Sequence, residues 1–221
     1  MHHSLSASLA AALLMAGLAA PAHAEAGDFI LRARGIAVIP SDKSGGIEPS
    51  FPNEKVSVST GWSPELDLTY FITKNIGVEV IAATTKHTAR GRTGTTGAIG
   101  PLLSTWVLPP TVTLQYHFAP DAVVRPYVGA GVNWSLFYST KPTEELEDAV
   151  GTTRTSMTNS WGWALQAGLD IPIGEKMLLN FDVKYIDIDS TASLTNTALG
   201  TQKVRVNVDP LVIGAGIGFR F

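Results

Sequence analysis

The sequence predicts an all-β protein: an eight-stranded antiparallel transmembrane β-barrel with short periplasmic turns and longer extracellular loops. Three observations lead to this fold class. Apolar and polar residues alternate with a period of two along eight segments, and the connections between these segments alternate between short and long. Charged residues make up only 16% of the 221 residues, fewer than the roughly 25% of soluble domains. This length allows one domain or one membrane barrel.

Composition also excludes several classes of function. The formal net charge of −3 and the lack of a basic patch argue against a protein that binds nucleic acid by neutralising phosphates. The chain has no cysteine, which excludes disulfide scaffolds, thiolate metal sites and cysteine nucleophiles together. We therefore expect no cofactor and no structural metal.

Residues 1–24 are predicted to be a secretory signal peptide. They contain no Asp, Glu, Lys or Arg, include the apolar stretch 9–20, and end in the small-x-small sequence Ala22-His23-Ala24. An N-terminal membrane anchor is the alternative, but the apolar stretch is short for a span and Pro21 would end it. Residues 25–221 are then the exported chain and form the barrel.

Eight segments of this exported chain alternate as strands do. In the segment 177–185, Met177, Leu179 and Phe181 lie on one face and Asn180 and Asp182 on the other. No stretch of the exported chain has the ~18 consecutive apolar residues of a helical span. The predicted strands are 29–39, 65–72, 76–82, 104–118, 125–136, 162–170, 177–185 and 211–221.

The connections fall into two classes. Residues 73–75, 119–124 and 172–174 are tight turns, whereas the other connections, such as 140–158, are long and rich in Ser, Thr, Gly and charge. The acidic run 144–148 in that connection is read as solvated, with a short helix. Short turns at one rim and long loops at the other are typical of outer-membrane barrels, in which closure leaves no edge strand.

Alternation alone also fits a soluble barrel of the lipocalin type, with its apolar face turned inward. Charges of both signs, interleaved with glycines on the polar face, instead favour a narrow lumen cross-linked by ion pairs. Aromatic residues near strand ends, such as Tyr116 and Phe118, suit the girdles at membrane interfaces. The candidate lumen charges are Arg32, Arg34, Asp67, Glu79, Asp182, Lys184 and Arg220.

Particular strings also occur in a fixed order along nearly all of the exported chain: 75–79 (NIGVE), 82–84 (AAT), 108–111 (LPPT), 125–131 (RPYVGAG), 160–162 (SWG), 187–189 (DID), 208–210 (VDP) and 218–221 (GFRF). As a set they resemble the OmpW family of small outer-membrane proteins. The resemblance implies an eight-stranded barrel in the outer membrane of a Gram-negative bacterium. It also implies a narrow, largely hydrophobic channel that passes small hydrophobic molecules.

Trp161 matches the family position associated with the channel constriction, and Leu66 is its candidate partner. An indole in a narrow, poorly hydrated lumen would bind apolar solutes and exclude ions by dewetting. Strict alternation, however, puts Trp161 on the same face as Trp163 and Leu165, which we assign to lipid. Either a bulge turns Trp161 inward or it belongs to the interfacial girdle.

Phe221 ends the chain as the last apolar residue of an alternating strand. Such an ending resembles the signal by which the barrel-assembly machinery recognises its substrates, and the strand suits β-augmentation. A girdle aromatic at the C-terminus is the alternative.

The exported chain is predicted not to be an enzyme. Its only histidines, His87 and His117, have no serine two residues away, so no local nucleophile and base share a strand face. Three aspartates near the outer rim allow two interpretations: Asp187, Asp189 and Asp209. A solvated polar loop is the favoured one, and a set of Ca²⁺ ligands is the alternative.

Pro109-Pro110 is the most unusual strand feature. Two consecutive prolines remove two ladder donors, so the fourth strand should bend or lose pairing there. The break is either a structural kink or a gap through which an apolar solute leaves the lumen sideways into the bilayer.

These observations favour a passive channel for small hydrophobic molecules, with outer-membrane lipid, such solutes and the barrel-assembly machinery as partners. A structural or interaction barrel whose outer loops bind phage, toxin or host surfaces is the alternative. A lipid-modifying outer-membrane enzyme is the third.

Overall fold

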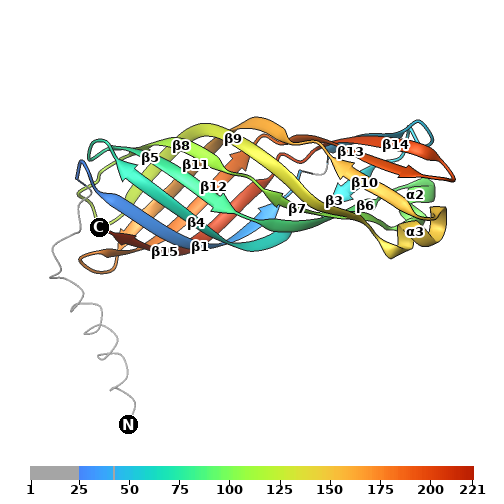
Figure 1. Ribbon diagram of the computed structural model, residues 1–221. Helices are drawn as coiled ribbons and strands as arrows, with labels where there is room; N and C mark the ends of the chain where they lie inside the picture. The colour runs from blue at the N-terminus through green and yellow to red at the C-terminus, as the bar shows by residue number, and fades with distance from the viewer. Residues whose placement is uncertain (1–24, 42) are drawn as a thin grey trace, which may run out of the picture.

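The computed structural model describes residues 25–41 and 43–221. The predicted signal peptide, residues 1–24, lies outside the described residues. The described chain forms one long barrel that continues into a second sheet at one end (Figure 1).

Eight strands close into a ring in which every neighbour is antiparallel. The ring runs in chain order and closes where the last strand pairs with the first, Arg220 opposite Ile30. This arrangement confirms the predicted fold class. The ring strands are β1 (Phe29–Ile39), β4 (Gly61–Phe71), β5 (Ile76–Ala83), β8 (Thr111–His117), β9 (Arg125–Pro142), β11 (Ser160–Pro172), β12 (Met177–Ile186) and β15 (Leu211–Arg220).

The short turns gather at one rim, which also holds the C-terminus (Figure 1). They join β4 to β5, β8 to β9 and β11 to β12 through residues 72–75, 118–124 and 173–176. Backbone hydrogen bonds tighten two of them, from Ile72 to Ile76 at 2.8 Å and from Ile173 to Met177 at 2.9 Å.

The long connections at the opposite rim are folded, and we call this part the extension. They were predicted to be loops, but the extension holds strands and two short helices: β2 (Lys43–Glu48), β3 (Val56–Val58), β6 (Thr85–Gly91), α2 (Gly94–Ile99), β7 (Pro101–Leu108), α3 (Glu144–Val150), β10 (Thr153–Met157), β13 (Asp189–Asn196) and β14 (Gly200–Asn207). Helix α3 covers the acidic run for which a short helix was considered. In the described residues, no helix is long and apolar enough to cross a membrane.

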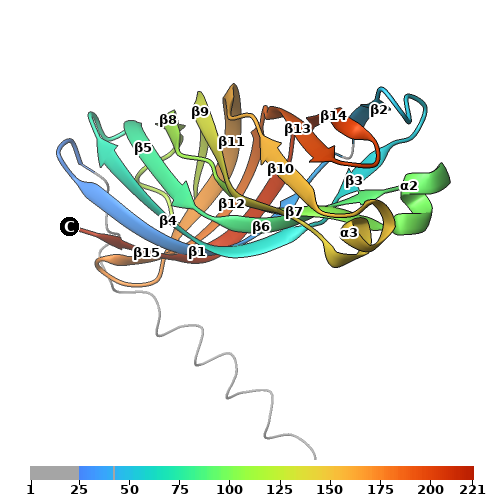
Figure 2. The same cartoon turned by 45° about the vertical axis from the view of Figure 1, so that its right-hand side comes forward.

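Two sheets build the extension (Figure 2). The first continues the barrel wall in the order β9-β7-β6-β3, and the second has the order β10-β13-β14-β2. The prediction of a single strand over 104–118 is therefore wrong, although the segment is mostly strand. It is divided at Pro109-Pro110 into β7, which belongs to the extension, and β8, which belongs to the ring, because neither proline can donate to a ladder.

The apolar face of each ring strand points outward. In β12, Leu178, Asn180, Asp182, Lys184 and Ile186 are buried in the barrel, while the intervening apolar side chains lie on the outer surface. A soluble barrel would show the opposite orientation, so the lipocalin alternative is wrong. The outer surface instead suits hydrocarbon.

Candidate functional site: an apolar cavity above a buried ion-pair network

Arg32 lies at the centre of the barrel lumen with its side chain fully buried. Its guanidinium donates to Asp170 from Nε at 3.2 Å and from Nη2 at 2.7 Å, which is a bidentate pair. Nη1 donates to Asp67 at 3.1 Å and to the Thr69 hydroxyl at 2.7 Å. One cation thus ties β1 to β4 and, across the lumen, to β11.

Arg34 and Lys184 extend this network one layer toward the extension. Arg34 contacts Glu65 at 2.8 Å, Asp67 at 2.7 Å and Glu79 at 3.2 Å. Lys184 Nζ lies 2.9 Å from Glu65 and 2.8 Å from Asp182. Every side chain in these pairs is at most 3% exposed.

The network joins three cations to five carboxylates: Arg32, Arg34 and Lys184 with Glu65, Asp67, Glu79, Asp170 and Asp182. Buried charges are tolerated only when they are paired, and here the pairing extends across the lumen. An apolar solute would have to break these contacts to pass. The network therefore closes the middle of the lumen to such a solute.

Six of the seven candidate lumen charges meet in this network. Arg220 does not, because it sits at the rim of short turns, where it pairs with Asp28 at 3.3 Å and remains partly exposed. Two members, Glu65 and Asp170, were not among the candidate lumen charges. Both have the inward parity of their strands, which would have identified them.

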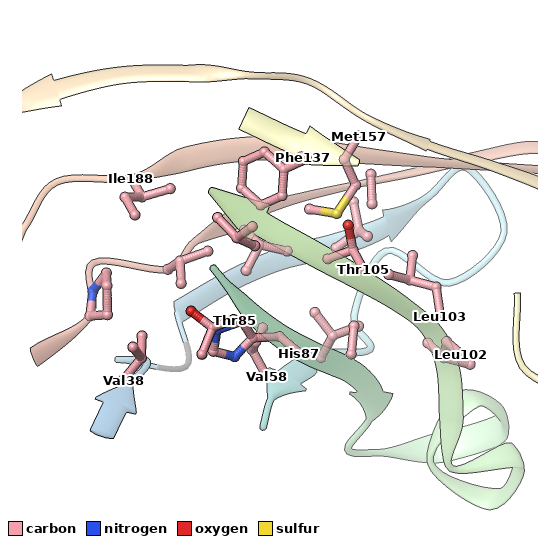
Figure 3. Close-up of a pocket in the computed structure, with 18 of the residues that line it drawn as sticks. Val38, Val58, Thr85, His87, Leu102, Leu103, Thr105, Phe137, Met157 and Ile188 are labelled. Carbon is pink, nitrogen blue, oxygen red and sulfur yellow. The ribbon is translucent and has the colours of Figure 1, made fainter. Parts of the chain in front are cut away.

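Above the network, toward the extension, lies a cavity of about 270 Å³. Its walls are almost entirely apolar and come from both the ring and the extension; Val38, Leu103, Phe137, Met157 and Ile188 are among the side chains shown in Figure 3. Glu65 and Lys184 also line the cavity, where the apolar wall meets the network.

The inward positions of the ring strands explain this change from charged to apolar. Along β1, Arg32 and Arg34 are followed on the same face by Ile36 and Val38. Along β12, Lys184 is followed in the same way by Ile186. The lumen therefore contains an ionic layer and, next to it toward the extension, the apolar cavity.

The backbone ladder of the barrel wall is interrupted beside this cavity. The ladder between β5 and β8 stops at Ile81 opposite Thr111, and the ladder between β6 and β7 resumes at Thr85 opposite Val107. Pro109, between the two ladders, lines the cavity. On the other side the wall is kept, since the Trp134 N–H donates to the Pro110 carbonyl at 3.0 Å.

Trp161 and Leu66 lie outside the barrel, with exposures of 72% and 56%. Trp161 stacks on Trp134 with ring centroids 5.4 Å apart, and the two residues are directly paired without a bulge. Ser160 is the residue that points inward. This placement contradicts the expectation that Trp161 and Leu66 narrow the channel, because regular alternation is kept where a bulge was required.

The remaining candidate residues occupy separate places. Phe221 closes the first and last strands, exchanging backbone hydrogen bonds of 3.0 Å with Phe29. Asp189 accepts from Arg205 at 2.9 Å and from Asn207, and Asp209 accepts from the Ile188 N–H at 3.2 Å. Over 25–41 and 43–221, no group of three or more His, Cys, Asp or Glu side chains is arranged to hold a metal ion.

Each of the two histidines in the described residues uses one ring nitrogen in a hydrogen bond within the protein. His117 lies in the lumen with Nε2 3.0 Å from the Gln115 amide oxygen. His87 belongs to β6 of the extension, where Nδ1 lies 2.7 Å from the Ser59 carbonyl oxygen. His87 lines the cavity, and burial lowers its pKa.

A closed ring of eight antiparallel strands with an apolar exterior and an ionic lumen defines the class: this protein is an outer-membrane β-barrel. The model of the OmpW family matches residues 25–221, and the chain belongs to that family. It is therefore a non-enzymatic barrel of the bacterial outer membrane.

Comparisons with individual proteins agree. The chain is 38% identical to outer membrane protein W of Escherichia coli over 218 residues, covering 97% of each chain. The crystal structure of OprG from Pseudomonas aeruginosa superposes with a TM-score of 0.84 at 32% identity, covering 91% of this chain and 99% of that one. Outer membrane protein AlkL of Ectopseudomonas oleovorans is 26% identical over 78% of this chain and 71% of its own length.

Proposed function

We propose that this barrel is a passive channel for small hydrophobic molecules. The observation that carries the proposal is the apolar cavity that ends on the ion-pair network. A chamber lined by apolar side chains binds an apolar solute by removing its surface from water. The resemblance to the OmpW family implies the same solute class.

The route follows from what closes the lumen. A solute enters through the extension, binds in the cavity, and meets Lys184 and Glu65 below it. Passing them would break buried ion pairs, which is costly. The exit that avoids this cost is sideways, through the interrupted wall at Pro109-Pro110 into the bilayer.

Ala83 and Ala82 offer a matched test of this route. Ala83 faces the cavity beside the interrupted ladder, and Ala82, the preceding residue of β5, faces outward. Ala83→Phe should slow uptake of a small apolar solute into cells or liposomes, because its ring fills the exit. Ala82→Phe should leave uptake unchanged.

Equal uptake by wild type, both variants and a deletion strain would overturn the channel. Reduced uptake by Ala83→Phe and Ala82→Phe alike would overturn the sideways exit only. A heat-modifiable gel shift, in which the folded barrel resists SDS until boiled, checks that each variant has folded.

A second function as a surface receptor has one observation in its favour. The extension presents folded sheets beyond the ring, which is a more rigid surface than irregular loops offer. Phage adsorption or host-cell binding that survives Ala83→Phe but is lost when residues 189–207 are replaced by a short linker would support it.

A further inference from the structure

Two polar side chains project into the apolar cavity from one face of β6. His87 is 5% exposed and Thr85 is 3% exposed, and both line the cavity (Figure 3). Both pack against Gly61 of β4, where an added Cβ would lie 2.7 Å from His87 Cε1, 2.8 Å from Thr85 Cγ2 and 3.1 Å from His87 Nε2.

The hydrogen bond to Ser59 sets the tautomer of His87. A carbonyl oxygen only accepts, so Nδ1, 2.7 Å away, carries the proton. Burial lowers the pKa of the imidazole, so the ring is neutral and Nε2 is a hydrogen-bond acceptor. Among the described residues, neither Nε2 of His87 nor the hydroxyl of Thr85 has a hydrogen-bond partner.

Other buried polar side chains of the cavity wall already have partners. The hydroxyl of Thr96 donates to Glu54, that of Thr105 pairs with Thr140, that of Thr111 donates to the Pro109 carbonyl, and the amide of Gln202 donates to the Leu199 carbonyl. Because both side chains line the cavity, and neither Nε2 of His87 nor the hydroxyl of Thr85 has a partner there, the pair favours a ligand that hydrogen-bonds to them.

Charge restricts the kind of polar group. The network below the cavity has five carboxylates to three cations, and its nearest cation, Lys184, is held by Glu65 and Asp182. A carboxylate head group would lose its hydration without gaining a free cation. A neutral hydroxyl group has the two capacities that this pair calls for, since it can donate to Nε2 of His87 and accept from the hydroxyl of Thr85.

We propose that the cavity prefers small uncharged amphiphiles that carry a hydroxyl group, such as alcohols, over hydrocarbons and carboxylates of the same size, with His87 and Thr85 as the specificity-determining pair. The inference rests on the proposed channel function and names its solute class. A neutral hydrogen bond of about 1 kcal/mol corresponds to about a fivefold change in affinity.

Three probes with one carbon skeleton separate the contributions: menthol, which donates and accepts, menthyl methyl ether, which only accepts, and p-menthane, which does neither. Each is titrated into the full barrel in lipid nanodiscs. His87→Phe should lower menthol affinity about fivefold and leave the other two unchanged. Thr85→Val should lower affinity for both menthol and the ether.

Phe137→Leu is the matched control, since Phe137 lines the same cavity without a polar group. It should lower affinity for all three probes alike. A wild-type measurement covers the case in which His87→Phe does not fold: in barrel labelled with ¹⁵N-histidine, menthol should shift the Nε2 resonance of His87 and leave that of His117 in place.

Equal losses for the three probes in His87→Phe, or a menthol-saturated barrel whose His87 resonance does not move, would overturn the hydroxyl preference and leave the channel standing. Failure of all three probes to bind the folded wild type would overturn the channel proposal together with the inference.

Discussion

Removing Arg34 should destabilise the barrel strongly. Arg34→Met keeps most of the length of the side chain but removes the charge that contacts Glu65 at 2.8 Å, Asp67 at 2.7 Å and Glu79 at 3.2 Å. It also removes the hydrogen bond of 3.0 Å to Asn180. The five carboxylates of the network would then face only Arg32 and Lys184.

The magnitude follows from burial. All the side chains that pair with Arg34 are at most 3% exposed, so water does not replace the lost cation. Breaking a buried pair by removing one partner costs about 3–5 kcal/mol. We expect a loss in this range for Arg34→Met, and a smaller loss for Arg34→Met combined with Glu65→Gln, because the second change removes one uncompensated carboxylate.

The assay is reversible urea unfolding of the barrel in phospholipid vesicles, followed by tryptophan fluorescence and extrapolated linearly to zero urea. Lys74→Met is the control, since Lys74 and Asp121 are exposed and 3.9 Å apart; it should change the free energy of unfolding by less than about 1 kcal/mol. An Arg34→Met loss as small as that of the control would refute the view that the network is a dry, closed layer.

Three further predictions follow from the placement of single residues. Trp161→Ala should leave ion conductance unchanged, and brominated lipid should quench the Trp161 fluorescence, since that side chain is 72% exposed on the outer face. Raised conductance in the variant would contradict this placement and indicate that Trp161 lines the lumen. Gly216→Ala should lower the free energy of unfolding by about 1–3 kcal/mol, because the added Cβ would collide with the Ala33 carbonyl oxygen. Gly35→Ala should be nearly neutral, since the space around Gly35 is open. Equal effects of the two changes in urea unfolding would count against this close approach of the strands. Menthol affinity should fall with decreasing pH, and only below the ordinary histidine pKa of about 6.5, because burial lowers the pKa of His87 and protonation removes the Nε2 acceptor. The ring packs against uncharged Ser59, Gly61 and Thr105, and the charged groups of the same cavity are Glu65 and Lys184. An affinity that does not change with pH, or an equal loss for p-menthane, would contradict this role of His87.

Alternation in the sequence was enough to predict the ring and the two faces of its strands. Each strand meets lipid on one side and the lumen on the other, and side chains of neighbouring residues must point to opposite sides. This local rule placed Arg32 inside and Phe181 outside. It also placed Trp161 outside, and the structure agrees with the rule rather than with the constriction implied by the family resemblance.

Tertiary structure decided which residues meet. Arg32 pairs with Asp170, 138 residues further along the chain, and no local pattern specifies that partner because the stagger of the closed barrel sets the height of each inward side chain. The cavity likewise combines residues of the ring with those of the extension, most of whose strands lie in segments predicted to be loops. The period of two in the sequence therefore determined which way each side chain points. Closure of the ring and folding of the extension determined which ions pair and placed His87 at an apolar cavity, because ring closure and folding of the extension depend on contacts between strands far apart in the chain.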